Sequence, residues 1–248
     1  TSRRTVGGGN GLLNNLVAYW PLNEAAGAND ALDIHTNGLT LTQTASPGSA
    51  AGIVYAGVRT FNGSTQYFSR ASQALLQAGD IDFTIAAWVQ LATKAMSDCQ
   101  IINKWHYSAS PSPKREYKLL YADTIDRFEF GLSPNGTSVS AVASNTFGPL
   151  AISTWYFVLC QHDSVANTIA IFVNDVGDSA AYNSGVLASD STFAIGRYSN
   201  VSGGYWNGRI GPVAMWKSAA GGGGVLTAAQ RTALFNAGNG LAYSAFTT

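Results

Sequence analysis

Two aromatic stretches stand near the ends of the chain: LVAYWPLNE at Leu16–Glu24 and YWNGRIGPVAMW at Tyr205–Trp216. Both combine aromatic and aliphatic side chains. Between them, short apolar runs alternate with clusters of Gly, Asn, Asp, Ser and Pro. Many short strands separated by regular turn signals are typical of a sandwich or a barrel. The sequence therefore predicts an all-β protein.

The strongest strand signal lies at 82–91, where DFTIAAWVQL is almost wholly apolar. The run RFEFGL alternates, so Phe128, Phe130 and Leu132 would share one face of a strand. The turn sequence Pro134-Asn135-Gly136 is a good hairpin signal. The other strands that we expect lie at 16–22, 66–69, 100–105, 117–121, 127–133, 138–143, 155–162, 168–173, 192–196 and 206–216.

One helix is predicted, in LTAAQRTALFNAG at Leu226–Gly238. Thr227 is a suitable N-cap, and Gln230 three residues later would complete a capping box. Apolar residues follow at helical spacing, and Gly238 stands where a C-cap is expected. The predicted helix is short and close to the C-terminus.

The composition narrows the possible partners. Charged residues make up 11% of the 248 residues, well below the typical value of about 25%. Lys plus Arg and Asp plus Glu each number 14, so the formal net charge is zero. The chain has no basic stripe of the kind that binds nucleic acid, and no apolar run approaches the ~18 residues of a membrane helix. We expect neither a nucleic-acid partner nor membrane insertion.

The order of these pieces resembles the laminin G-like, concanavalin A-like lectin/glucanase sandwich domains, particularly those of phage and bacterial surface proteins. The resemblance covers roughly Leu16 to Tyr243. It is carried by AYWPL, FNGS, FTIAAW, IINKW, TWYFV, FAIGR and NGRIG, followed by the C-terminal helix. It implies a jelly-roll sandwich of two antiparallel sheets, whose first and last strands pair, as a single domain over residues 16–248. It also implies binding rather than catalysis.

Residues 1–15 are Gly-rich and polar, which predicts a flexible N-terminal arm. The chain opens with Thr1 rather than Met, so we expect that a leading segment was removed or that the chain was cut from a longer protein. We predict that the arm contacts other protein subunits, either copies of this chain or capsid or fibre proteins. The residues that we assign to this assembly contact are Arg3, Arg4, Gly7, Gly8 and Gly9.

Members of the resembled family often hold calcium at the edge of the sandwich. The resemblance makes Asp33, in DIHTNG, the candidate metal ligand of this chain. The family often has a second acid directly after the Gly-Arg-Ile element, where this chain has Gly211 and Pro212. Calcium takes about 6–8 oxygen ligands. The sequence therefore leaves two readings of Asp33, a calcium ligand and a turn residue, and offers Ca²⁺ as the one candidate cofactor.

Two clusters at strand-to-loop junctions could bind carbohydrate. Their members are Trp105, His106 and Tyr107 in the first cluster, and Tyr205, Trp206 and Asn207 in the second. Sugars present flat C–H faces that stack on aromatic rings, while amide side chains bond to hydroxyl groups. We hypothesise that these residues bind a polysaccharide. The alternative is ordinary packing, because aromatic side chains dominate cores as well as interfaces.

No catalytic residues are predicted. The only glutamates are Glu24, Glu116 and Glu129, and none lies in the Glu-x-Asp-x-x-Glu pattern of the glucanases that share this sandwich. The three histidines have no metal-ligand spacing. Cys99 and Cys160 lie in strand-like runs, where buried cysteines are usually inert. We expect two free thiols, with one cross-strand disulfide as the alternative.

These observations favour two functions. The first is a non-enzymatic structural protein of a virion or cell surface, such as a capsid decoration or a fibre component, with a possible role in glycan adhesion. The alternative is the lectin module of a secreted protein, which binds carbohydrate through calcium or through an aromatic platform. A glycoside hydrolase ranks third, because that chemistry needs two paired carboxyl groups. Both favoured functions place the protein on a virion surface or outside the cell.

Overall fold

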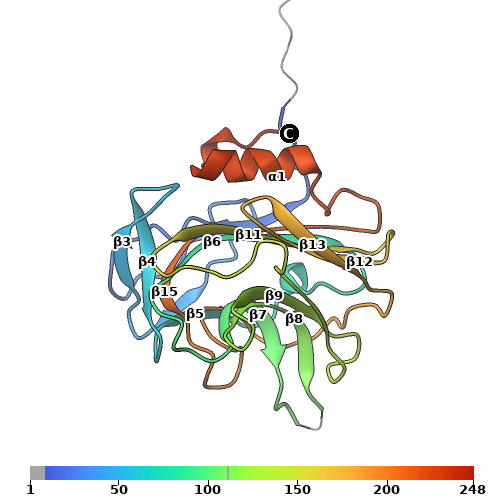
Figure 1. Ribbon diagram of the computed structural model, residues 1–248, viewed down its shortest axis with the longest axis horizontal. Helices are drawn as coiled ribbons and strands as arrows, with labels where there is room; N and C mark the ends of the chain where they lie inside the picture. Colours follow the sequence, from blue (N-terminus) through green and yellow to red (C-terminus); the bar gives the residue numbers. More distant parts are fainter. Residues whose placement is uncertain (1–8, 111) are drawn as a thin grey trace, which may run out of the picture.

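The computed structural model describes residues 9–110 and 112–248. Its strands form two antiparallel sheets that pack face to face, with one short helix near the C-terminus (Figure 1). The predicted all-β sandwich is therefore confirmed. Side chains from the facing sides of both sheets fill a single large apolar core, which includes Trp20, Phe83, Phe130 and Trp206.

The sheet nearer the helix, here called the back sheet, has the order β13-β12-β11-β6-β15-β4-β3, with β1 also paired to β15. Its strands are β1 (Leu16–Trp20), β3 (Gly48–Ala51), β4 (Gly57–Asn62), β6 (Asp82–Leu91), β11 (Trp155–Asp163), β12 (Thr168–Val173), β13 (Val176–Ala181) and β15 (Asn207–Ser218).

The opposite sheet, here called the front sheet, has the order β10-β9-β8-β7-β14-β5-β2. Its strands are β2 (Thr42–Thr44), β5 (Tyr67–Arg70), β7 (Cys99–His106), β8 (Lys114–Ala122), β9 (Arg127–Leu132), β10 (Ser140–Ala143) and β14 (Phe193–Ile195). Three short 3-10 turns, η1 (Ala74–Leu76), η2 (Asn236–Gly238) and η3 (Tyr243–Ala245), lie in the connections and at the C-terminal end.

The first and last strands pair, as the resemblance implied. In β1 and β15, Leu16 lies opposite Trp216 and Trp20 lies opposite Val213. The first part of β15 pairs instead with β4, and a bulge follows Ile210. Pro212 falls in this bulge, where its missing N–H costs no ladder hydrogen bond. The position at which a second calcium-binding acid was sought is thus a structural bulge.

The sequence predicted most of the strands but missed four of them. The missed strands are β2, β3, β4 and β13. Three of these lie at sheet edges, and β3 (GSAA) and β13 (VGDSAA) consist mostly of small or polar residues. Such residues have low strand propensity. Pairing with a neighbouring strand, rather than local sequence, makes these segments extended.

The predicted helix forms as α1 (Ala228–Phe235). Thr227 Oγ1 accepts a hydrogen bond from the Gln230 amide, and the Gln230 side chain accepts one from the Thr227 amide, so the capping box is confirmed. The helix ends earlier than expected, because Asn236 rather than Gly238 adopts the left-handed cap with φ 48°. Among the described helices, none has the length and apolar character needed to cross a bilayer.

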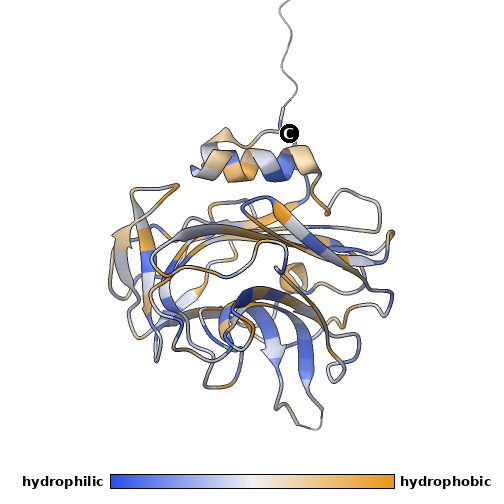
Figure 2. Cartoon of the chain, in the orientation of Figure 1, coloured by the Kyte–Doolittle hydropathy of each residue, from blue (hydrophilic) through white to orange (hydrophobic). Residues whose placement is uncertain are grey.

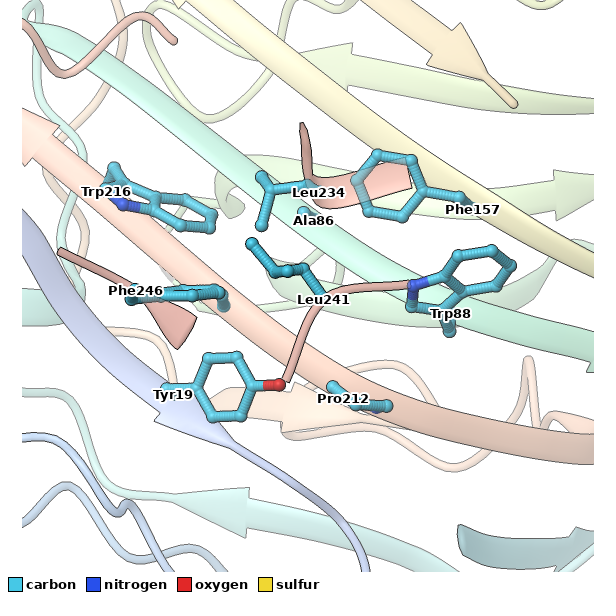
Figure 3. Close-up of a pocket in the computed structure, with 10 residues that line it drawn as sticks. Tyr19, Ala86, Trp88, Phe157, Pro212, Trp216, Leu234, Leu241 and Phe246 are labelled. Atoms are coloured by element: carbon cyan, nitrogen blue, oxygen red, sulfur yellow. The ribbon is translucent and has the colours of Figure 1, made fainter. Parts of the chain in front are cut away.

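Helix α1 and the C-terminal segment cover the outer face of the back sheet (Figure 1). Figure 3 shows Leu234 and Leu241 above the back-sheet rings of Trp88, Phe157 and Trp216. The enclosed space between these side chains is about 20 Å³, room for about one water molecule. The central strands β6, β11 and β15 of the back sheet are therefore buried on both faces, and this second core offers no space for a ligand of sugar size.

The arm predicted at residues 1–15 is shorter than expected. From Asn10 onward the chain packs against the C-terminal end: Asn10 bonds to Thr247 through its backbone and its side chain. Leu12 is fully buried, and its carbonyl accepts a hydrogen bond of 2.8 Å from Trp216 Nε1. Residues 10–15 thus belong to the folded domain. Most of the proposed assembly arm, including Arg3, Arg4, Gly7 and Gly8, lies outside the described residues.

A buried ion pair joins the front sheet to two loops. Lys104 Nζ lies 3.7 Å from Glu116 Oε2, and neither side chain is exposed. Lys104 donates to Ser72 Oγ and to the Ser191 carbonyl, while Glu116 accepts from the amide and hydroxyl of Ser189. Burial lowers the pKa of Lys104 and raises the pKa of Glu116, and the charge of each partner opposes the shift of the other.

Removing one charge of this pair should destabilise the domain strongly. We expect Glu116→Gln to lower the free energy of unfolding by about 3–5 kcal/mol, because Lys104 would remain buried without a counter-charge. Urea denaturation measures the change. Asp190→Asn, which breaks the exposed ion pair of Lys114 and Asp190, serves as the control and should cost less than about 1 kcal/mol. Equal effects of the two substitutions would contradict the role given to burial.

Candidate functional site

The loop between β14 and β15, residues 196–206, lies against strand β7 of the front sheet. The Gly204 carbonyl accepts a hydrogen bond of 2.9 Å from the Gln100 amide. The Asn103 side chain donates to the Arg197 carbonyl at 2.6 Å. These bonds hold the loop at both of its ends. The loop therefore presents its side chains from a fixed backbone, as binding loops on rigid scaffolds do.

This loop brings the two predicted aromatic clusters together. Tyr198 packs edge-to-face on Tyr107 of the first cluster, with ring centroids 5.2 Å apart. Gly204 allows this arrangement, because a Cβ there would lie 2.7 Å from the Tyr198 ring and its φ is +57°. Tyr205 of the second cluster follows directly. The loop thus brings residues of the two clusters, which are about 100 positions apart in the sequence, to one surface.

In the first cluster, only Tyr107 presents a ring to solvent. Its relative exposure is 40%, whereas that of Trp105 is 4%. The Arg115 guanidinium and the Lys118 ammonium lie 5.8 and 5.4 Å from the Trp105 ring centroid and cover it. His106 is half-buried at the end of β7. Trp105 is therefore a packing residue beneath two cations, which is the alternative to carbohydrate binding that the sequence left open.

In the second cluster, Trp206 has no exposed surface and points into the core between the sheets. The structure therefore does not place Trp206 on a binding surface. Tyr205 and Asn207, its neighbours, line a pocket of about 220 Å³ together with Gly63 and Met96. Trp206 is buried while its two neighbours line the pocket, because successive side chains of an extended chain point to opposite faces. Drug-sized ligands occupy pockets of about 300–1,000 Å³, so this one is suited to a single sugar ring.

Three residues of this surface, Tyr67, Arg197 and Tyr198, were missed by the sequence reasoning. The Arg197 guanidinium lies 3.8 Å from the centroid of the Tyr67 ring, and the Tyr67 ring centroid lies 6.4 Å from that of Tyr205. A hydrogen bond with Ser202 and the nearby Arg197 charge lower the pKa of Tyr205. The sequence FAIGR, which ends in Arg197, was recognised only as a fold element. No local sequence signal connects Tyr67 with residues that lie 130 positions later. The residues of this connected surface, here called the loop surface, are Tyr67, Tyr107, Arg197, Tyr198, Tyr205 and Asn207.

Charged side chains flank the loop surface on the outer face of the front sheet, where Figure 2 shows hydrophilic colours over β7, β8 and β9. Lys118 Nζ lies 2.8 Å from Glu129 Oε1. Asp98 is half-buried beside this pair. Burial raises the pKa of Asp98, and the Lys118 charge opposes that shift. Asp98 and Glu129 thus both interact with Lys118.

Asp33 is a turn residue in this structure. Its Oδ1 accepts hydrogen bonds from the amides of Tyr19 and His35, and its Oδ2 accepts one from the amide of Leu39. Within residues 9–110 and 112–248, no group of three His, Cys, Asp or Glu side chains could hold a metal ion. Calcium needs several oxygens with carboxylates among them. The surroundings of Asp33 do not fit that ion.

The family model described as the concanavalin A-like lectin/glucanases superfamily matches residues 62–222, well over half of the chain. The chain belongs to this superfamily. No sequence among the curated proteins matches it. The two-sheet sandwich described above is the fold expected of the superfamily.

Solved structures with the same fold include the binding domain of a mosquitocidal protein and a domain of an enzyme. The binding domain of Paraclostridial Mosquitocidal Protein 1 has a TM-score of 0.62 at 15% identity, covering 91% of this chain and 53% of that one. Domain 4 of AbnA, an extracellular arabinanase from Geobacillus stearothermophilus in complex with arabinotriose, has a TM-score of 0.62 at 15% identity, covering 88% and 97%.

A third structure concerns botulinum neurotoxin type C, whose cell entry depends on interaction with two ganglioside molecules. It has a TM-score of 0.61 at 12% identity, covering 91% of this chain and 52% of that one. This concanavalin A-like chain thus spans about half the length of both toxin chains and nearly all of the arabinanase domain. At these identities the likeness is one of fold.

Three carboxylates of this superfamily member are engaged in ion pairs. Glu116 belongs to the buried ion pair, and Glu129 is paired with Lys118. Asp126 pairs with Lys94 at 2.7 Å. These pairs do not provide the free acid and nucleophile that face each other across a scissile bond in glycosidases.

The two cysteines are free and buried, as expected, and form no disulfide. Cys160 is fully enclosed, and burial raises its pKa. Burial also raises the pKa of Cys99, to about 12, with smaller contributions from Asp123 and Asp98. The thiolate is the nucleophilic form of cysteine. Neither thiol is therefore suited to act as a nucleophile at neutral pH.

We expect iodoacetamide at pH 8 to leave both cysteines of the native protein unmodified over a period in which a urea-unfolded sample gains two carbamidomethyl groups. Burial excludes the reagent, and the raised pKa values keep the thiols protonated. Intact-protein mass spectrometry counts the adducts. Rapid modification of Cys99 or Cys160 in the folded sample would show that its strand is more accessible than described.

Proposed function

We propose that this domain is a non-enzymatic carbohydrate-binding module and that the loop surface is its binding site. The observation that carries the proposal is the gathering of four tyrosines by one fixed loop, next to a pocket of about 220 Å³. These tyrosines come from three distant parts of the sequence. Tyr107 contacts Tyr198 of the loop, and Tyr67 lies beside Tyr205 of the loop.

The chemistry of the loop surface suits a sugar. Tyrosine offers a large, rigid ring at low entropic cost, and its hydroxyl bonds to polar groups. Asn207 lines the pocket, where its amide would bond to ligand hydroxyls. The proposed arrangement is therefore an aromatic wall, formed by Tyr205 and Tyr67, beside a polar pocket.

The solved structures support a binding role without identifying a ligand. The arabinanase domain that shares this fold was solved with arabinotriose. The mosquitocidal protein structure is of a binding domain, and the cell entry of botulinum neurotoxin type C depends on gangliosides. The superfamily contains both lectins and glucanases. The ion pairs made by Glu116, Glu129 and Asp126 favour the lectin class for this chain.

The placement of the chain ends suits display at a surface. Asn10 and Thr247 are hydrogen-bonded to each other on the helix side of the molecule, whereas the front sheet lies on the opposite side (Figure 1). A tether at either end would leave the front sheet and its loops facing outward. We therefore propose an extracellular or particle-surface location.

A structural role in a virion, as a capsid decoration or a fibre component, remains a prediction. It depends on contacts of the N-terminal arm with other subunits, and residues 1–8 of that arm lie outside the described structure. The glycan-binding proposal does not depend on the arm, because the loop surface is on the other side of the sandwich.

We expect the purified domain to bind a subset of a broad glycan array, and Tyr205→Ala and Tyr107→Ala each to weaken that binding about tenfold or more, the scale of a tyrosine hot spot. Titration calorimetry with the best array ligand measures the change. Tyr107→Phe retains the ring and should keep most of the affinity. Val165→Ala, at an exposed site in the turn between β11 and β12, is the control for folding.

We expect glycan binding to persist when EDTA removes calcium, because both carboxylate oxygens of Asp33 accept hydrogen bonds from backbone amides. Loss of binding with EDTA would instead support a calcium lectin. Absence of binding across the array, or full affinity in both alanine variants, would contradict the proposed site.

A further inference from the structure

Arg197 differs from every other arginine in the described part of the chain. The others each donate a hydrogen bond to a protein oxygen: Arg59, Arg70, Arg115, Arg127, Arg209 and Arg231. Within the same residues, the Arg197 guanidinium makes no ion pair with a carboxylate, and the polar group recorded beside it is the hydroxyl of Tyr205. Its charge is held in place but is not neutralised by the protein.

Stacking, rather than hydrogen bonding, holds this guanidinium. The centre of the group lies 3.8 Å from the centroid of the Tyr67 ring, the closest cation–ring distance in the described structure. A stacked guanidinium uses its flat face, while its N–H groups project in the plane. Nε of Arg197 is buried without a hydrogen-bond partner. In-plane N–H groups are those that bind a carboxylate or a sulfate in a bidentate manner.

The backbone of Arg197 is also fixed. The Asn103 side chain donates to its carbonyl at 2.6 Å. The preceding Gly196 has φ +88°, and a Cβ there would lie 2.8 Å from the Phe61 ring. The chain can therefore follow this path only with glycine at position 196. A guanidinium that is already oriented loses little conformational entropy when an anion binds.

The charges around Arg197 favour an anion. Asp98 and Glu129, two acidic groups near the loop, interact with Lys118. Arg197 has no carboxylate partner within the described residues, and its hydrogen bond and charge help to lower the pKa of the Tyr205 hydroxyl. Arg197 therefore gives the loop surface a positive charge that is not paired with a protein carboxylate.

We propose that Arg197 binds the carboxylate or sulfate of an acidic saccharide whose sugar ring lies beside Tyr205 and Asn207. This inference rests on the proposed glycan-binding function and adds the charge class of the ligand. The anionic group would bind the in-plane N–H groups of Arg197, and the ring hydroxyls would face the Asn207 amide.

Paired probes that differ only in charge test the proposal. Oligogalacturonate and a sulfated galactan oligomer are titrated into the domain, each beside its neutral counterpart, the carboxyl-reduced or desulfated oligosaccharide. We expect the wild type to bind at least one acidic probe about tenfold more tightly than its neutral partner, as hydrogen bonds to charged groups allow. The carboxylate and sulfate arms separate the two possible anions.

Substitutions of Arg197 test whether this residue causes the preference for the acidic probe. Arg197→Gln should abolish the difference within each pair, and Arg197→Lys should keep only part of it, because lysine lacks the bidentate geometry. Raising the salt concentration should reduce the wild-type preference. Arg127→Gln, which removes a charge elsewhere on the front sheet, is the control and should retain it. Thermal melts verify that all variants are folded.

The outcomes separate this inference from the proposed function. If the wild type binds glycans but no acidic probe more tightly than its neutral partner, or if Arg197→Gln keeps the preference, the role of Arg197 is overturned and the binding module stands. If no glycan binds, both proposals fail.

Discussion

The rest of the molecule depends on the pairing of strand β15 with three other strands. One of its sides pairs with β6, and the other pairs first with β4 and then with β1. Its two faces serve two cores: Ile210, Val213 and Met215 pack between the sheets, while Ala214 and Trp216 pack under α1. Because β1 and β15 come from opposite ends of the sequence, this one strand joins the domain into a single cooperative structure.

The position of the loop surface follows from the same strand. The loop that gathers the tyrosines leads directly into β15, and its other end leaves β14 of the front sheet. It therefore crosses from one sheet to the other, and hydrogen bonds to Gln100 and Asn103 fix it over β7. A loop that is tied to both sheets can hold aromatic rings and a charge in defined positions, which a free loop cannot do without a large entropic cost.

The sequence predicted the fold well and the site only in part. Alternation and turn signals located β6, β9 and β12 to within a residue, and the Thr227 capping box predicted the start of α1. Edge strands such as β3 were missed because pairing, not propensity, makes them extended. Of the two proposed aromatic clusters, Tyr107, Tyr205 and Asn207 are available at the surface, whereas Trp105 and Trp206 are buried.

The sequence by itself determined most of the strands, the helix cap and the buried thiols, because these follow from local periodicity and residue type. The resemblance to a known family added the sandwich fold. Only the tertiary structure decided which aromatic rings reach solvent, that Asp33 closes a turn, and that Tyr67 and Arg197 stack. The physical reason is that exposure and stacking depend on strand register and sheet packing. These bring together residues that are more than a hundred positions apart and leave no trace in the local sequence.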